Sequence, residues 1–134
     1  MLNVFPDLLT YSLLAPFLIR ISLGLIFIYF AYLKFSTERE RKTLFFEHIG
    51  LKPGIIFVWI VGAVELIAGV LLVVGLYTQI AALAATALMS AAVVIKLRHK
   101  NALPNDAAFY ILLSIASLSI IFSGAGFFAI DLPL

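Results

Sequence analysis

Four long apolar runs take up most of the chain and decide what it can fold into. A helix needs about 20 mostly apolar residues to cross the roughly 30 Å of hydrocarbon in a bilayer. Runs of about this length lie at 13–35, 54–76, 79–96 and 107–122. Only 12% of the residues are charged, whereas about 25% is usual in a soluble domain. The sequence therefore predicts one transmembrane domain over 1–134, folded as an all-α integral membrane four-helix bundle.

The three connections between these runs predict the topology. They lie at 36–52, 77–78 and 97–105, and they are short enough to make successive helices antiparallel neighbours. We therefore expect an up-down-up-down bundle. In the first connection, the charge run 37–42 is expected to be solvated surface. The segment 44–50 carries large apolar side chains that we expect to lie flat on the membrane surface.

Lysine and arginine gather on one side of the predicted bundle. Eight of the nine basic residues lie at the first and third connections: Lys34, Arg39, Arg41, Lys42, Lys52, Lys96, Arg98 and Lys100. The positive-inside rule then predicts that 36–52 and 97–105 are cytoplasmic, with both termini outside the cell membrane. The N-terminus lacks a basic region with a cleavage site of small residues, so we expect no removable signal peptide.

The residue types present exclude several kinds of chemistry. The chain has no cysteine, which excludes disulfides, thiolate metal sites and iron–sulfur clusters. Its two histidines, His48 and His99, lie in predicted connections, so a haem within the spans would lack a histidine ligand. We therefore expect no metal site and no encoded redox centre. The basic residues lie where membrane topology puts them, and we expect no nucleic-acid partner.

Two charged residues lie deep inside predicted spans. Charges in a span are costly and usually face the bundle interior in pairs. Arg20 lies roughly 12 Å along its helix from the outer end, and Glu65 roughly 16 Å, at the rise of an α-helix. Adjacent antiparallel helices would hold the two within a turn of each other. We therefore predict an Arg20–Glu65 ion pair, which either fixes helix register or takes part in binding or proton movement.

Helical spacing puts these charges on packing seams. Arg20 begins a stripe with steps of four and three residues that ends at Lys34, and Glu65 lies on a similar stripe beside Gly62 and Gly69. Small residues on such stripes allow helices to approach closely. Lys34 has two interpretations, because a lysine at a helix end can also extend to the lipid headgroups.

Three stretches resemble motifs of the DoxX family. RISLGLIFIYFAYLKF (20–35) resembles the first-helix pattern of arginine, glycine and distal lysine. VGAVELIAGVLLVVGLYTQIAAL (61–83) resembles the second signature, a glutamate followed by glycines and a short turn. GAGFFAID (124–131) resembles the closing glycine–aspartate motif. Ala31 departs from the pattern, since a glycine is usual there, and the stretch 126–131 is more apolar than is common.

The resemblance implies a small four-helix protein of the bacterial inner membrane. The family includes subunits of thiosulfate:quinone oxidoreductase and proteins associated with quinone or oxidative-stress redox chemistry. The positions that match its polar motif residues are Arg20, Lys34, Glu65 and Asp131. The tail motif comprises Gly124, Gly126 and Asp131.

We expect the protein to be an accessory or quinone-associated subunit of a membrane redox system. A quinone carbonyl needs a donor such as Arg20 or Lys34, and its redox change needs a proton partner such as Glu65. Apolar pockets with a few polar groups are typical of ligand sites. Because no redox centre is encoded, the chain would be at most one subunit of a quinone-linked oxidoreductase. Its expected partners are the lipid bilayer, a membrane or redox subunit, or a second copy.

Two alternatives remain open from the sequence. A small-molecule or proton-coupled transporter is less favoured, because a glutamate neutralised by arginine is a poor receptor for cations. A structural or assembly subunit would bind another membrane protein through the alanine-rich run 79–96.

Overall fold

The computed structural model describes residues 4–131, which contain helices and no strand. The elements are a 3-10 helix η1 (Pro6–Tyr11) and the α-helices α1 (Leu14–Phe35), α2 (Arg39–His48), α3 (Gly54–Val74), α4 (Thr78–Arg98) and α5 (Ala107–Ser123). Helices α1, α3 and α4 are long and apolar enough to cross a membrane, and α5 is apolar but has 17 residues. The predicted all-α membrane bundle is confirmed.

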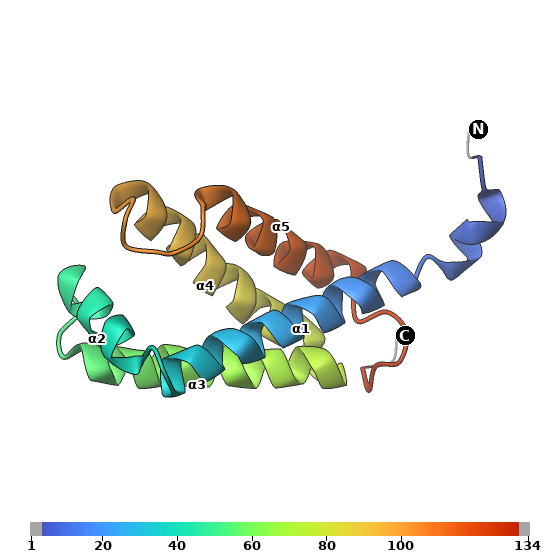
Figure 1. Ribbon diagram of the computed structural model, residues 1–134. Helices are drawn as coiled ribbons and strands as arrows, with labels where there is room; N and C mark the ends of the chain where they lie inside the picture. Colours follow the sequence, from blue (N-terminus) through green and yellow to red (C-terminus); the bar gives the residue numbers. More distant parts are fainter. Residues whose placement is uncertain (1–3, 132–134) are drawn as a thin grey trace.

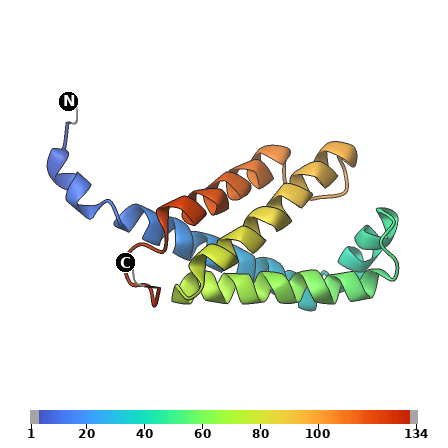
Figure 2. The ribbon, with the colours of Figure 1, turned by 180° about the vertical axis from the view of Figure 1, so that it is seen from behind.

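The bundle consists of two antiparallel helical hairpins (Figure 1). Helices α1 and α3 pack along most of their length, and α4 packs against α5. The hairpins meet at the end that carries the α3–α4 turn and residues 124–131, which we call the tail end. They diverge toward the other end, which carries α2 and the α4–α5 connection and which we call the α2 end (Figures 1 and 2). Both basic connections therefore lie at one end of the bundle.

Two glycines bring α1 and α3 into backbone contact. A Cβ atom on Gly24 would lie 2.8 Å from the Gly69 carbonyl oxygen, and one on Gly69 would lie 2.8 Å from the Gly24 oxygen. No side chain larger than hydrogen fits at that distance, so the pair fixes the register of the two helices. The buried positions of α1 include the whole predicted stripe from Arg20 to Lys34. The seams predicted from helical spacing are confirmed.

Helix α2 differs from the sequence prediction. The apolar residues of 44–50 were expected to lie flat on the membrane, but Phe46 is buried and its ring stacks on Phe57 of α3, with 6.2 Å between centroids. A Cβ atom on Gly54 would collide with the Thr43 carbonyl, so α2 packs directly on the start of α3. The rings are covered by protein because α2 folds back over the bundle, whereas Leu44 stays exposed.

Candidate functional site

A buried ion pair joins α1 to α3 near the middle of the bundle. The Lys34 ammonium nitrogen lies 3.0 Å from Glu65 Oε1 and 2.8 Å from Oε2. Lys34 is 9% exposed and Glu65 is 3% exposed. Lys34 therefore does not extend to the headgroups, and its charge is neutralised inside the protein.

The predicted Arg20–Glu65 ion pair is wrong. Each Cα–Cβ bond in a helix tilts toward the N-terminus of that helix. Because α1 and α3 are antiparallel, Arg20 leans toward the tail end while Glu65 leans toward the α2 end. Lys34 leans back from the α2 end and meets Glu65. Helical depth alone suggested the wrong partner because it ignores these side-chain directions.

Arg20 instead binds four backbone carbonyl oxygens at the tail end. Its guanidinium donates to Leu72 O at 3.0 Å and Val73 O at 3.3 Å, where α3 ends. It also donates to Phe127 O at 3.0 Å and Phe128 O at 3.2 Å in the tail. The last carbonyls of a helix carry partial negative charge and lack partners within the helix. Arg20 supplies those partners and ties the tail to α3.

Asp131 completes this arrangement from the far end of the tail. Its Oδ2 accepts the backbone N–H of Thr78 at 2.6 Å, and its own N–H donates to Gly75 O at 2.7 Å. The carboxylate thus caps the N-terminus of α4. The hydrogen bond from Thr78 holds the pKa of Asp131 below its usual value, and the Arg20 charge acts in the same direction. Asp131 therefore anchors the tail to the start of α4.

The two glycines of the tail motif allow the chain to turn at the end of α5 and pack against the start of α1. Gly124 ends α5 with φ 79°. Gly126 packs so closely on the start of α1 that a Cβ atom there would lie 2.7 Å from Leu13 O and from Phe17 N. The matched polar positions therefore fall into two groups. Arg20 and the tail motif form a clamp at the tail end, whereas Lys34 and Glu65 lie elsewhere.

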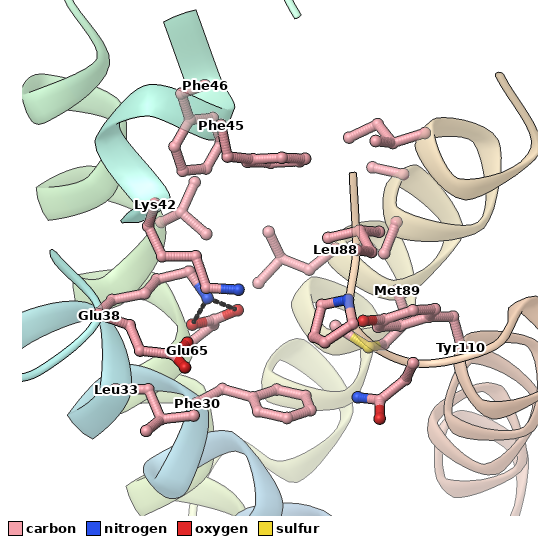
Figure 3. A pocket seen from close by; sticks show the side chains of 18 of the residues that line it. Phe30, Leu33, Glu38, Lys42, Phe45, Phe46, Glu65, Leu88, Met89 and Tyr110 are labelled. Atoms are coloured by element: carbon pink, nitrogen blue, oxygen red, sulfur yellow. Dashed lines mark hydrogen bonds and ion pairs between the residues drawn. The ribbon is translucent and has the colours of Figure 1, made fainter. Parts of the chain in front are cut away.

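The Lys34–Glu65 pair lies in the wall of a cavity of about 340 Å³ between the diverging hairpins. Side chains of α1, α2 and α3 form one wall, and side chains of α4, α5 and their connection form the other (Figure 3). Glu38 and Lys42 join Glu65 on the first wall, facing Leu88 and Met89 of the second. One side of the cavity is thus charged and the opposite side is mainly apolar.

Aromatic rings cover much of the cavity surface. Phe30, Phe45 and Phe46 contribute from the charged side, and the Lys34 ammonium lies 5.9 Å from the centroid of the Phe30 ring. Tyr110 of α5 faces the cavity from the other side (Figure 3). Flat apolar rings beside a few polar groups suit a planar ligand with polar edges.

One oxygen of Glu65 has no hydrogen bond within residues 4–131. Glu65 Oε2 is close to Lys34 but lacks the alignment of a hydrogen bond, and it is buried. A buried carboxylate oxygen with unused acceptor capacity is unfavourable unless a further donor reaches it. This oxygen has almost no accessible surface, so a donor from a ligand in the cavity reaches it only if the Lys34–Glu65 pair shifts.

Lys42 is the cavity residue that sequence reasoning missed most clearly, since the run 37–42 was expected to be solvated. It is partly buried, and burial together with the nearby Lys34 charge lowers its pKa. A signal was present in the sequence. Glu38, Lys42 and Phe46 recur every four residues from the N-cap of α2 onward, the spacing of one helix face, and all three line the cavity.

The α4–α5 connection closes the cavity on the second side through Leu103, Pro104 and Asn105. Lys96 holds this connection in place, since its ammonium donates to Lys100 O at 2.6 Å and to Leu103 O at 2.8 Å.

The two histidines meet at the α2 end of the bundle. The rings of His48, at the end of α2, and His99, after α4, lie edge to face with centroids 5.8 Å apart. Among residues 4–131 no three side chains of histidine, cysteine, aspartate or glutamate are grouped to hold a metal ion. The imidazole contact therefore joins the two hairpins at the α2 end of the bundle.

Two comparisons with known proteins return matches. The model of the DoxX family matches residues 15–97, which run from the start of α1 to the last turn of α4. This range includes Arg20, Lys34 and Glu65, and Asp131 lies beyond it. A protein of Bacillus subtilis (strain 168) named "Putative oxidoreductase CatD" is 35% identical over 115 residues, covering 85% of this chain and 82% of that protein. No solved structure matches the chain significantly.

Proposed function

This chain belongs to the DoxX family, and we propose that it binds a quinone-type ring as the accessory subunit of a membrane redox system. The observation that carries the proposal is the Glu65 carboxylate, which is buried beside an aromatic-lined cavity and keeps one oxygen without a hydrogen bond. The name of the Bacillus subtilis relative, an oxidoreductase, is consistent with a redox role.

The size of the cavity suits the head of a quinone. A volume of about 340 Å³ is near the lower end of the range for small-molecule sites, roughly 300–1,000 Å³. One or two fused rings would fill it. Tyr29 lines the cavity and is 57% exposed on α1, so the cavity reaches the outer surface of that helix. A long apolar tail would leave along this route into the lipid.

The polar groups suit the edges of such a ring. A quinone accepts two electrons and two protons on reduction, and its quinol returns them on oxidation. In our proposal the Lys34–Glu65 pair shifts when the ring binds, and Glu65 Oε2 then accepts a hydrogen bond from a hydroxyl of the quinol form. Tyr110 contacts the opposite edge of the ring. Phe30 and Phe45 cover its faces.

In our proposal, the electrons that reduce or oxidise the ring are exchanged with a second protein. The chain has no cysteine, and His48 and His99 lie at the ends of α2 and α4, away from the ion pair. We therefore propose that a partner redox subunit delivers or removes electrons, while this chain binds the ring and exchanges a proton.

We also propose that the cavity faces the cytoplasmic half of the cell membrane. Both basic connections lie at the α2 end, where the hairpins diverge around the cavity (Figure 1). The positive-inside rule assigns that end to the cytoplasm and the termini to the outside.

The test is the lipid content of the protein purified from native membranes in mild detergent. Extracted lipids would be identified by mass spectrometry for the wild type, for Glu65→Gln, and for Glu40→Gln as a matched control. Glu40 is exposed on α2 and does not line the cavity. We expect quinone in about equal amounts in the wild type and the control, and about tenfold less in Glu65→Gln.

Helicity and thermal unfolding would be measured on the same samples, because Gln keeps the size of the side chain but leaves the buried Lys34 ammonium without a charged partner, and loss of binding must be separated from loss of stability. Absence of quinone from the folded wild type, or undiminished quinone in folded Glu65→Gln, would contradict the proposal.

A further inference from the structure

Lys42 gives the cavity a positive charge that forms no ion pair among the described residues. Its ammonium makes no ion pair and no hydrogen bond within residues 4–131. Figure 3 shows its side chain extending from α2 toward Glu65. The Glu65 carboxylate already neutralises Lys34 at 2.8–3.0 Å, so it is shared and cannot fully balance a second cation.

The other acid of the cavity is also shared. Glu38 Oε1 lies 3.5 Å from Arg41 Nη1, on the side that faces solvent. The charged residues that line the cavity are Lys34, Lys42, Glu38 and Glu65, which are equal in number of each sign. Because Glu65 pairs with Lys34 and Glu38 is shared with Arg41, Lys42 has no carboxylate of its own.

The surroundings of Lys42 make its charge unfavourable in the unliganded protein. Burial is the largest cause of its lowered pKa, and repulsion by Lys34 is the second; attraction by Glu38 and Glu65 does not offset them. An anion placed in the cavity would interact with Lys42 at short range and in a medium less polar than water, where such attraction is strong. A charge-assisted hydrogen bond to the ammonium would add to it.

We propose that the cavity selects a ring that carries an ionised oxygen, such as an ionised hydroxyquinone, over the neutral ring, and that Lys42 determines this selectivity. This inference rests on the proposed function and narrows its substrate class. The ionised oxygen is held by Lys42, and the ring lies against the aromatic side chains of the cavity.

Two probes of nearly equal shape separate the effects. 1,4-Naphthoquinone is neutral, and 2-hydroxy-1,4-naphthoquinone is ionised at neutral pH. Their Kd values would be measured by calorimetry on the full chain in detergent. We expect the wild type to bind the ionised probe about tenfold more tightly, a ratio that corresponds to about 1.4 kcal/mol.

Lys42→Gln should reduce this ratio to about one, with the larger change in the Kd of the ionised probe. Lys42→Arg should keep the preference. Lys52→Gln, the same change at an exposed lysine of the same connection that does not line the cavity, should also keep it. Lowering the pH until the hydroxyl is protonated should abolish the preference in the wild type.

The outcomes distinguish this inference from the proposed function. If both probes bind the wild type equally, or if Lys42→Gln keeps the preference, the selectivity is refuted while ring binding stands. If neither probe binds the folded wild type, both the proposed function and the selectivity are refuted.

Discussion

The Lys34 ammonium lies 2.8 Å from Glu65 Oε2 across the α1–α3 seam, in a position where both side chains are almost fully buried. This contact and the Gly24–Gly69 contact fix how α1 lies against α3. The Lys34–Glu65 contact also places a charged group in the wall of the cavity. One pair of residues therefore connects the packing of the first hairpin to the chemistry of the site.

Removing one partner of the Lys34–Glu65 pair should lower the free energy of unfolding far more than removing both. Lys34→Met or Glu65→Leu alone leaves a buried charge without a partner, which typically costs about 3–5 kcal/mol. The double variant Lys34→Met/Glu65→Leu replaces both charges with apolar side chains and should be markedly more stable than either single variant. Thermal unfolding of the purified proteins in detergent measures this. Additive losses in the double variant would show that the two residues do not interact.

Arg20 should hold the tail on the bundle. Lysine at this position has one ammonium in place of the guanidinium fork and cannot reach Leu72 O and Phe127 O together. We expect Arg20→Lys to lose about 2 kcal/mol of stability, in line with hydrogen bonds to charged groups. Limited proteolysis should then cut the chain after Gly124 faster than in the wild type. The same change at the exposed Arg98 is the control, and equal cutting rates in all three proteins would contradict the role of Arg20.

The attachment of the tail should depend on pH through Asp131. Its pKa is lowered in the folded protein, so the carboxylate stabilises the attached tail at any pH well above its ordinary value of 3.8. This stabilisation is lost as the pH falls through the lower pKa of the folded state. Proteolysis of the tail by an acid-active protease should therefore accelerate below about pH 3.8 in the wild type. Asp131→Asn should lack that acceleration, and a step of equal size in both proteins would assign it to another group.

The absence of native cysteines makes the membrane orientation easy to test. Single cysteines at Thr37, in the basic connection, and at Ile130, in the tail, would both be exposed. A membrane-impermeant maleimide should label Ile130→Cys in intact cells, and Thr37→Cys only after the cells are lysed. The reverse pattern would invert the orientation and place the cavity in the outer half of the membrane.

Local sequence patterns predicted the helices and seams because those depend on residues close in sequence. The stripe from Arg20 to Lys34 is buried as its spacing of four and three residues predicts. Gly24 and Gly69 lie at the close approach that small residues on a seam indicate.

The partners of the charged residues could not be read from those patterns. Arg20 binds Phe127 O, more than a hundred residues away, because the tail returns across the end of α3. The cavity results from the divergence of two hairpins, which no single run of residues encodes. Lys42 appeared to belong to a solvated charge run because α2 folds back onto α3 only in the tertiary structure.

The central claim is that a quinone-type ring binds between the hairpins beside Glu65. The most direct measurement is photolabelling of the wild-type protein in native membranes with an azidoquinone, followed by mass spectrometry of the labelled peptides. We predict labels in 29–46 and 103–110, which line the cavity, and competition by unlabelled quinone. Labels confined to the tail end, at 72–78 and 124–131, or labels that unlabelled quinone does not displace, would contradict the claim.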